Sequence, residues 1–450
     1  MIEMKDILNT VICGDCLEVM RQLPDCSVDT LITDPPYGLK FMGKTWDYQV
    51  PSVGHFAEML RVARPGAILL CFGGSRTWHR IACHIEDAGW QIRDTLFWLY
   101  GSGLPKSLDI GKDFDRRACM EKLTQELGRR PTKKEWDAAW KNFRKVVGKR
   151  TDRAATSKCD IRGGKLVGGD RPRIDLSDIT GPTTEMAKAW DGWGTGLKPA
   201  CEPIIAAMKP LDGTFIENAE KWGVAGMNID GGRISHDEPS KTTTRKKNTG
   251  IGWNNTNCGL RENQTNIASA NGKGRWPANV ILDEEAAAML DEQSGQLQSN
   301  SGNLKPLIGR TVNTYGQFAM KSGKGISDIG GASRFFYTAK ADKTERDAGL
   351  RDAGIYGKYE GKLTLPRKNH HPTVKPLDLM VYLCRLTMTP AGGLILDPYA
   401  GSGTTLRAAE AVGRPFIGIE IAPEYCEIAR RRVRFERDKL VLFNKSVPSV

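Results

Sequence analysis

The sequence of 450 residues lacks any apolar run near the ~18 residues that a membrane-spanning helix needs. Its first ten residues, MIEMKDILNT, also lack the basic segment and apolar block of a secretory signal. These absences favour a cytoplasmic protein without membrane segments. The apolar content of 40% still suffices, at this length, for a substantial core and more than one structural unit.

Histidine is scarce, and cysteine follows no pattern. There are six histidines, and the eleven cysteines show no spacing typical of a disulfide framework. Cys13 and Cys16 form a CxxC pair, but no second CxxC or HxxxH stands at the distance of a zinc site. We therefore expect reduced thiols and no metal site.

Acidic residues are in the minority. The chain has 65 basic and 53 acidic residues, a net charge of +12, which favours a polyanionic partner. Two runs carry cations without anions, at 141–150 and 241–250, although a solvated charged face is the alternative interpretation of either run. The candidate phosphate contacts within these runs are Lys141, Arg144, Lys145, Lys149, Arg150, Arg245, Lys246 and Lys247.

The two ends of the chain alternate strand and helix patterns, whereas the middle does not. Near the start, apolar strands are predicted at 28–33, 67–72 and 94–101, with helices at 53–64 and from Ser75, its expected N-cap. Near the end, a helix is predicted at Leu377–Leu386, followed by LILD, GTTLRAAEAVG, FIGIE and a basic final helix. Continuous apolar strands that alternate with helices predict an α/β fold: a Rossmann-like, mostly parallel sheet covered by helices on both faces.

The middle of the chain contains a helix pair, a strand and a long irregular stretch. Residues 123–148 are predicted to form two short helices around Pro131. The segment 202–210, EPIIAAMKP, has the character of another strand of the sheet. Residues 240–275 are rich in Gly, Asn, Ser, Thr and Lys, a composition that cannot form a compact core alone.

The motif DPPY at Asp34–Tyr37 follows directly after an apolar strand. Because Pro35 and Pro36 fix φ and lack N–H donors, the carbonyls of Asp34 and Pro35 stay out of local turns. The Asp34 carboxylate and the Pro35 carbonyl can then accept both hydrogens of one exocyclic amino group, which frees the lone pair of its nitrogen. Tyr37 offers a face for base stacking, worth roughly 1–3 kcal/mol. Such chemistry requires a base outside the duplex; a proline-rich turn with Asp as a cap is the alternative.

The stretch LDPYAGSGTT at 396–405 joins the strand LILD to a helix. Gly401 and Gly403 allow a ligand to approach the backbone closely. No G-K-[ST] follows, which disfavours a phosphate-binding P-loop. Glu420 ends the next strand, where its carboxylate suits the two hydroxyls of a ribose. S-adenosylmethionine fits such a site, and NAD fits it less well because GSGTT does not match GxGxxG.

Together these motifs resemble those of DNA amino-methyltransferases of the adenine N6 and cytosine N4 family. The order resembles the β arrangement, in which DPPY comes first and the donor motif last, and phage or prophage members with a long central insertion. CGDC, with Asp15, and HPTVKP, at 371–376, match two further elements of that family. The resemblance covers roughly residues 10–104, 199–210 and 366–445.

The resemblance implies a role for each matching residue. Thr373 and Lys375 would border the methionine end of the methyl donor, and Asp397 would reach its amino group. Glu420 would hold the ribose, and Asp15 would lie near the adenine of the donor. Pro398, Gly401, Gly403 and Thr404 would complete the donor loop.

The same resemblance implies five segments. Residues 1–104 would form the catalytic half of the core, and 366–450 the half that binds S-adenosylmethionine. Residues 105–198 would be an insertion with the helix pair, 199–210 a core strand, and 211–365 an irregular α+β target-recognition region.

The implied activity is transfer of a methyl group from S-adenosylmethionine to adenine N6 at a specific site in double-stranded DNA, by base flipping and direct displacement. Cytosine N4 methylation remains an alternative, because the boundary between DPPY and SPPY enzymes is imperfect. A catalytically silent DNA-binding protein is a remoter one. No PD…ExK nuclease arrangement is evident, so a restriction endonuclease acting with this protein would be a separate chain.

Overall fold

The computed structural model describes residues 3–39, 47–103, 107–149, 178–234, 274–298, 312–313, 316–317, 329–340, 344–350, 358–359, 362–363, 369–371 and 373–446. The chain divides into two compact units. The core unit comprises Met1–Ser102 and Ala200–Val450, and the inserted unit comprises Gly103–Pro199. Of the helices in the described ranges, none combines the length and apolar character needed to cross a bilayer.

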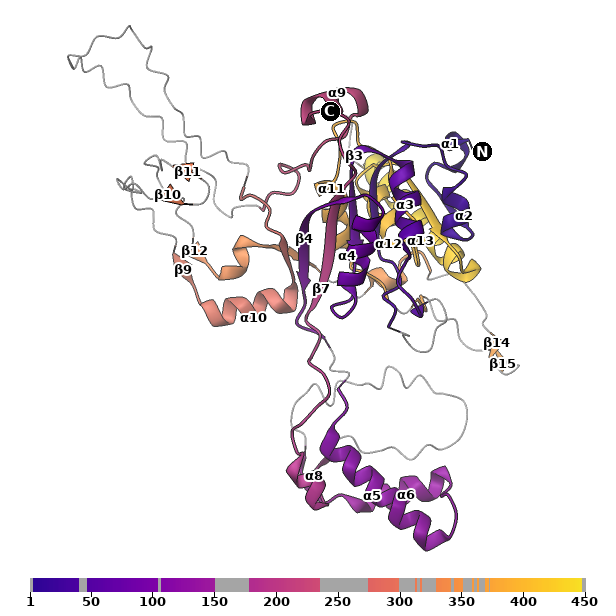
Figure 1. Cartoon of the computed structure of the whole chain (residues 1–450), viewed down its shortest axis with the longest axis vertical. Coiled ribbons are helices and arrows are strands. Elements are labelled where there is room, and N and C mark those ends of the chain that lie inside the picture. The colour runs from indigo at the N-terminus through magenta and orange to yellow at the C-terminus, as the bar shows by residue number, and fades with distance from the viewer. Residues whose placement is uncertain are drawn as a thin grey trace, which may run out of the picture. The chain divides into compact units, whose positions relative to one another are not determined.

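The core unit is built on a sheet of nine strands in the order β1-β17-β16-β2-β3-β7-β4-β8-β13. Figure 1 labels three of these strands, with β7 between β3 and β4. Only β7 runs antiparallel, to both of its neighbours; the other pairs are parallel. The strands are β1 (Thr10–Cys13), β2 (Val28–Thr33), β3 (Ala63–Phe72), β4 (Gln91–Leu99), β7 (Cys201–Met208), β8 (Val280–Asp283), β13 (Tyr337–Ala339), β16 (Ile395–Asp397) and β17 (Phe416–Glu420). The predicted α/β, mostly parallel sheet is confirmed.

Helices cover both faces of this sheet, because successive strand residues point to opposite sides. Leu31 and Leu69 pack with α2 (Cys16–Met20), α3 (Val53–Val62) and α4 (Trp78–Asp87) on one face. Ile32 and Leu70 pack with α11 (Leu377–Leu386), α12 (Thr404–Ala411) and α13 (Pro423–Ser446) on the other. All six strand residues of β2 are buried, as expected for a central parallel strand.

The remaining elements of the core unit are short or lie outside this sheet. They are α1 (Met4–Ile7), α9 (Phe215–Trp222), α10 (Glu284–Ser294), the 3₁₀ helices Ala332–Phe335 and Glu345–Asp347, and three two-stranded pairs. The pairs are β9 (Leu297–Gln298) with β12 (Ile329–Gly330), β10 (Val312–Asn313) with β11 (Gly316–Gln317), and β14 (Lys358–Tyr359) with β15 (Lys362–Leu363).

Predicted boundaries in the first hundred residues are wrong at three places, one of which is β4, which spans Gln91–Leu99 rather than 94–101. Strand β3 begins at Ala63, directly after α3, and runs through Pro65 and Gly66. Gly66 has φ of +79°, and the register with β2 shifts nearby, so the two residues form an irregularity within the strand rather than a break before it. Helix α4 begins after Thr77, not at Ser75, and Thr77 makes no side-chain capping hydrogen bond.

The inserted unit has its own helices and a small sheet. Helix α5 (Ile110–Leu127) packs against α6 (Lys133–Phe143) and α8 (Glu185–Ala189), while β5 (Val146–Lys149) pairs with β6 (Asp178–Thr180). The predicted helix pair around Pro131 is present, but its first helix begins at Ile110, well before the expected start, and residues 146–148, expected to be helical, belong to β5. The N-cap Asp109 accepts a hydrogen bond from the Lys112 N–H and sets that start.

Candidate active site

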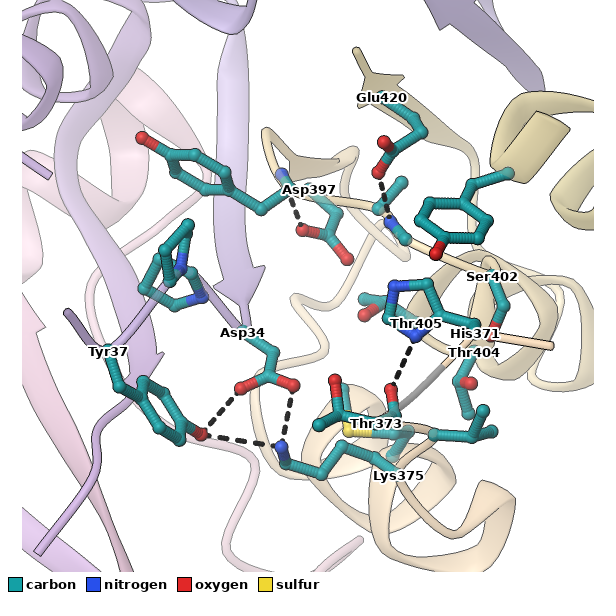
Figure 2. Close-up of a pocket in the computed structure, with 18 of the residues that line it drawn as sticks. Asp34, Tyr37, His371, Thr373, Lys375, Asp397, Ser402, Thr404, Thr405 and Glu420 are labelled. Atoms are coloured by element: carbon teal, nitrogen blue, oxygen red, sulfur yellow. Dashed lines mark hydrogen bonds and ion pairs between the residues drawn. The ribbon is translucent and has the colours of Figure 1, made fainter. Parts of the chain in front are cut away.

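A cavity of about 390 Å³ lies where the two ends of the chain meet. Strands β2, β16 and β17 are adjacent and parallel, so their carboxyl ends open onto the same edge of the sheet. Asp34, Asp397 and Glu420 come from these strand ends, and all three line the cavity (Figure 2). Of the predicted site residues, the lining includes Asp34, Pro35, Pro36, Tyr37, Thr373, Lys375, Asp397, Gly401, Thr404 and Glu420.

Asp34 is held by two contacts, one to each carboxylate oxygen. The Tyr37 hydroxyl donates to Oδ1 over 2.6 Å, and the Lys375 ammonium donates to Oδ2 over 2.6 Å (Figure 2). Burial, reinforced by the charge of Asp34, raises the pKa of Tyr37 well above its usual value, so the phenol keeps its proton. Burial alone would lower the pKa of Lys375, but the negative charges of Asp34 and Glu202 raise this pKa above its usual value. An ammonium therefore faces a carboxylate.

The glycine-rich turn after β16 is fixed to the end of β17. Gly401 has φ of +52°, and its N–H donates to Glu420 Oε2 over 2.8 Å. A Cβ at Gly401 would come within 2.9 Å of His371 Nε2, so a side chain here would collide with the wall of the cavity. Glu420 Oε1 accepts from the Ala422 N–H, and this carboxylate is buried at the rim.

Asp397 is a buried carboxylate whose hydrogen bonds fix its direction. Oδ1 accepts from the Thr33 hydroxyl over 2.8 Å and from the Tyr399 N–H over 3.1 Å. Burial raises the pKa of Asp397 to about 6, against the effect of these hydrogen bonds and one from Thr405. The group is therefore poised to ionise fully when a cation approaches it.

His371 forms a neutral wall of the cavity. Its Nδ1 lies 2.8 Å from the Thr373 carbonyl oxygen, which places the ring proton on Nδ1, and its ring meets Tyr425 edge-on at 4.5 Å. Burial lowers the pKa of His371 to about 4. A neutral, oriented imidazole next to Gly401 gives the cavity a fixed polar edge without charge.

Three predicted site residues do not line the cavity. Asp15 is the N-cap of α2 and accepts hydrogen bonds from the Leu17 and Glu18 N–H groups. Gly403, with φ of +77°, precedes α12, and a Cβ there would lie 2.8 Å from Cβ of Ala429. The absence of a side chain at Gly403 thus serves helix packing. Pro398 also lies outside the lining.

The predicted phosphate contacts fall into three groups. Lys141 and Lys145 are exposed on the inserted unit. The expectation for Arg144 is wrong: its side chain is only 7% exposed, and its guanidinium forms a 3.1 Å ion pair with the fully buried Asp115. Of Lys149 only the backbone is described, as the end of β5. Four candidates lie outside the described residues: Arg150, Arg245, Lys246 and Lys247.

Sequence reasoning missed several residues of the cavity. Glu202 stands at the start of β7, whose antiparallel direction brings its amino end to the edge where the parallel strands finish. Trp98 pairs with Glu202 across β4 and β7 and also lines the cavity. A charged residue at the start of an otherwise apolar strand was the available signal for Glu202. For Trp98, Tyr399 and Tyr425 the sequence carried no comparable signal.

Comparison with known proteins identifies a related region. Residues 234–431 match the sequence pattern of the family described as DNA methylase, of the N6 and N4 type. This range contains HPTVKP, the glycine-rich turn and Glu420, whereas DPPY lies before it.

Curated relatives match over shorter stretches. The chain is 47% identical over 68 residues to the type II methyltransferase M2.DpnII of Streptococcus pneumoniae, covering 15% of this chain and 25% of that protein. It is also 47% identical over 64 residues to the DNA adenine methyltransferase YhdJ of Escherichia coli K12, covering 14% and 21%. These matches span about a quarter of the relatives' own length.

Among solved structures, the cytosine-N4-specific PvuII DNA methyltransferase aligns with a TM-score of 0.39 at 13% identity, covering 97% of this chain and 91% of that one. The M1.HpyAVI–SAM complex aligns with a TM-score of 0.34 at 14% identity, covering 94% and 98%. By the sequence match, residues 234–431 are similar to the DNA methylases of the N6 and N4 type, and this stretch carries the glycine-rich turn and Glu420 of the cavity.

Proposed function

We propose that the chain is a site-specific DNA methyltransferase that transfers a methyl group from S-adenosylmethionine to the exocyclic N6 of adenine in double-stranded DNA. One observation carries the proposal: the Asp34 carboxylate, the glycine turn at Gly401 and the Glu420 carboxylate line a single cavity. These residues stand far apart in the sequence, and the sheet brings together the two parts that such a transfer needs.

The cavity fits S-adenosylmethionine on the chemistry of its walls. Glu420 offers carboxylate oxygens for ribose hydroxyls, while its own orientation is fixed by the N–H groups of Gly401 and Ala422. The buried Asp397 suits the cationic amino group of a methionine moiety. Burial disfavours the charged form of this carboxyl group, and a nearby cation would stabilise that form. At Gly401 the backbone leaves free the space that a Cβ would fill.

The donor, when bound, supplies a methyl group on a sulfonium, a good leaving group that departs as a neutral thioether. The residues of this chain orient the acceptor. Asp34, together with the Pro35 carbonyl, would accept hydrogen bonds from the two hydrogens of the target amino group and direct its lone pair. The nitrogen would form one bond to the methyl carbon as the carbon–sulfur bond breaks, and would then lose one proton, either to the Asp34 carboxylate or to solvent. Holding both reactants in line supplies much of the rate.

Duplex DNA as the partner is supported by the charge of the inserted unit. Residues 103–199 contain 22 basic and 14 acidic residues, so they carry +8 of the net +12 of the whole chain. Exposed cations on and beside α6 form no ion pair with any other described residue of the chain. We call this set the α6 basic face; it consists of Arg130, Lys133, Lys134, Lys141 and Lys145.

The decisive experiment incubates the purified protein with S-adenosylmethionine and unmodified DNA and identifies methylated nucleosides by mass spectrometry. N6-methyladenine is expected, and sequencing that reads modified bases would give the recognition site. N4-methylcytosine instead would establish the second candidate, which the imperfect boundary of the DPPY signature keeps open. Any restriction endonuclease partner would then be sought as a separate chain that cleaves the mapped site.

A single substitution separates a methyltransferase from a DNA-binding protein that merely keeps the fold. Asp34→Ala should abolish methyl transfer and leave binding of S-adenosylmethionine largely unchanged, because Glu420, Asp397 and Gly401 are untouched. Calorimetry measures the donor affinity and nucleoside analysis the activity. Equal loss of both would show that Asp34 has no separate role, and no methylation by the wild-type protein would refute the proposal.

A further inference from the structure

The Lys375 ammonium lies inside a cage of acceptors and aromatic rings. Its Nζ is 2.6 Å from Asp34 Oδ2, 3.1 Å from Glu202 Oε2 and 3.3 Å from the Tyr37 hydroxyl oxygen. The same atom lies 5.0 Å from the ring centroid of Phe72 and 5.6 Å from that of Tyr37. The Lys375 side chain is only 9% exposed, so the cage encloses the nitrogen almost completely.

This cage has the properties that an exocyclic amino group requires. Such a group brings N–H donors and no acceptor in its trigonal form, and it is attached to a flat ring. One of its hydrogens can go to Asp34 and the other to the Pro35 carbonyl or to Glu202, and the ring of Tyr37, which lines the cavity, can border a flat base. An ammonium group and a nucleobase amino group are both N–H donors, so both can bind the same oxygen acceptors of this cage.

We propose that the cage formed by Asp34, Glu202 and Tyr37 is the receptor of the target amino group, with Glu202 as its second carboxylate and Lys375 yielding its place when the amino group enters. The proposal rests on the function proposed above and adds Glu202 as a positioning residue. It also assigns Lys375 a role in competing with the target, separate from its expected contact with the methyl donor.

The fold explains why Glu202 can take this part. The Tyr37 hydroxyl oxygen lies 2.6 Å from Asp34 Oδ1, to which it donates, and 3.3 Å from Glu202 Oε2, so the phenol stands between the two carboxylates. Beside Glu202, the buried indole N–H of Trp98 has no acceptor among the described residues. Buried donors are usually paired, and an unpaired one at this wall marks a place where a polar edge of a ligand could be received.

The arrangement has a consequence for specificity. The Asp34 and Glu202 side chains are 21% and 22% exposed, and two carboxylates around one partly enclosed site are costly without a cation or several donors, which Lys375 supplies in the structure described. Only a group that also brings N–H donors can replace the ammonium. A base with a carbonyl oxygen at the same position would set an acceptor against two carboxylates, which is repulsive. The cage therefore selects an amino group and rejects thymine O4 and guanine O6.

The test compares binding of two duplexes that differ only in the target amino group. One carries the mapped target base, and the other carries purine in place of adenine, or 2-pyrimidinone in place of cytosine. Affinities are measured by fluorescence anisotropy with S-adenosylhomocysteine present. The ratio of the two affinities reports the contribution of the amino group. We expect Glu202→Ala to reduce this ratio by about tenfold to a hundredfold, the usual range for a hydrogen bond to a charged group.

Two further variants keep the proposal falsifiable. Glu202→Gln retains one acceptor oxygen and should preserve more of the ratio than Glu202→Ala, at unchanged thermal stability. Lys375→Met removes the competing ammonium and should increase the ratio. Glu424→Ala, an exposed carboxylate outside the cavity, is the matched control.

The outcomes separate the inference from the proposed function. An unchanged ratio in a folded Glu202→Ala or Glu202→Gln protein that still binds the donor would overturn the role of Glu202. A ratio that falls in Lys375→Met would overturn the exchange, because it would make Lys375 part of the receptor. Absence of methylation by the wild-type protein on any DNA would instead defeat the proposed function itself.

Discussion

Gly401 donates its backbone N–H to the Glu420 carboxylate over 2.8 Å, so the glycine turn after β16 and the end of β17 form one rigid rim. Burial raises the pKa of Glu420, while the N–H groups of Ala422 and Gly401 oppose that shift. Two neighbouring amides therefore hold the carboxylate in place. The fold itself therefore sets the orientation of this carboxylate at the wall of the cavity.

The first prediction concerns this rim. Glu420→Gln should weaken binding of S-adenosylmethionine by about tenfold to a hundredfold, because hydrogen bonds to a charged group contribute about 1.5–3 kcal/mol each. The amide would also turn its NH₂ group toward an N–H or toward the ribose. Isothermal titration calorimetry measures the change.

Glu424→Gln is the control for this prediction, because Glu424 is exposed in the first turn of α13 and does not line the cavity. It should bind the donor as the wild type does. Equal affinities of Glu420→Gln and wild type would remove Glu420 from the donor site.

The second prediction concerns pH, through two buried groups with opposite effects. Burial raises the pKa of Asp397 from 3.8 to about 6, so the folded protein holds this proton more tightly than the unfolded chain. Its contribution to stability is fully present below pH 4 and is lost as the pH rises through 6. By linkage the loss is on the order of 3 kcal/mol.

His371 works in the other direction. Burial lowers its pKa from 6.5 to about 4, so the unfolded chain binds this proton more tightly. The stability that goes with neutral His371 is present above pH 6.5 and is lost as the pH falls through 4. On acidification from pH 6 to pH 4, protonation of Asp397 therefore increases the free energy of unfolding of the protein, whereas protonation of His371 decreases it.

Thermal melting between pH 4 and 7 checks the two signs. Asp397→Asn removes the stabilisation that protonation of Asp397 provides. The melting temperature of this variant should therefore fall more steeply on acidification than that of the wild type. His371→Gln removes the destabilisation that protonation of His371 causes, so its melting temperature should fall less steeply. Curves for both variants that run parallel to the wild-type curve would contradict these assignments.

The sequence predicted the parts of the site that end parallel strands. Asp34, Asp397 and Glu420 each follow an apolar run, and in a parallel sheet such ends share one edge. The fold class follows from the same alternation of strand and helix patterns. For this reason the donor half and the catalytic half could be expected to meet across several hundred residues of chain.

The rest could not be predicted from local patterns. Glu202 reaches the cavity only because β7 runs antiparallel, which no feature of its own segment specifies. A basic run shows charge and not burial, so Arg144 could not be told from Lys141 or Lys145. The true partner of Arg144 is Asp115, on a helix whose start lies before the predicted range.

The third prediction concerns that buried pair. Asp115 accepts hydrogen bonds from the N–H groups of Thr183 and Thr184 in addition to its ion pair with Arg144. Removing one partner of a buried pair leaves the other charge unpaired, so Arg144→Met should destabilise the inserted unit by about 3–5 kcal/mol. Faster hydrogen exchange in α5 and α8 should report this destabilisation.

Lys141→Met is the matched control for Arg144, because Lys141 is exposed three residues before it. It should leave the protection of α5 and α8 unchanged. If Arg144→Met keeps the exchange pattern of the wild type and only weakens DNA binding, Arg144 would be a phosphate contact after all.

The last prediction concerns the α6 basic face. Replacing Lys133, Lys134, Lys141 and Lys145 with glutamine should weaken DNA binding equally for specific and unrelated sequences, because phosphate contacts carry no sequence information. The logarithm of the DNA association constant decreases with the logarithm of the salt concentration. The magnitude of this slope should become smaller by about 0.9 for each DNA phosphate that the variant no longer neutralises. A control that replaces Lys5, Lys221 and Lys439, exposed on the core unit, should keep the wild-type slope. Both sets of substitutions remove surface charge, so an equal decrease in the magnitude of the slope for both would indicate a net-charge effect. Weaker binding confined to the target sequence would indicate base contacts. Either result would contradict a DNA-backbone-binding face on the inserted unit.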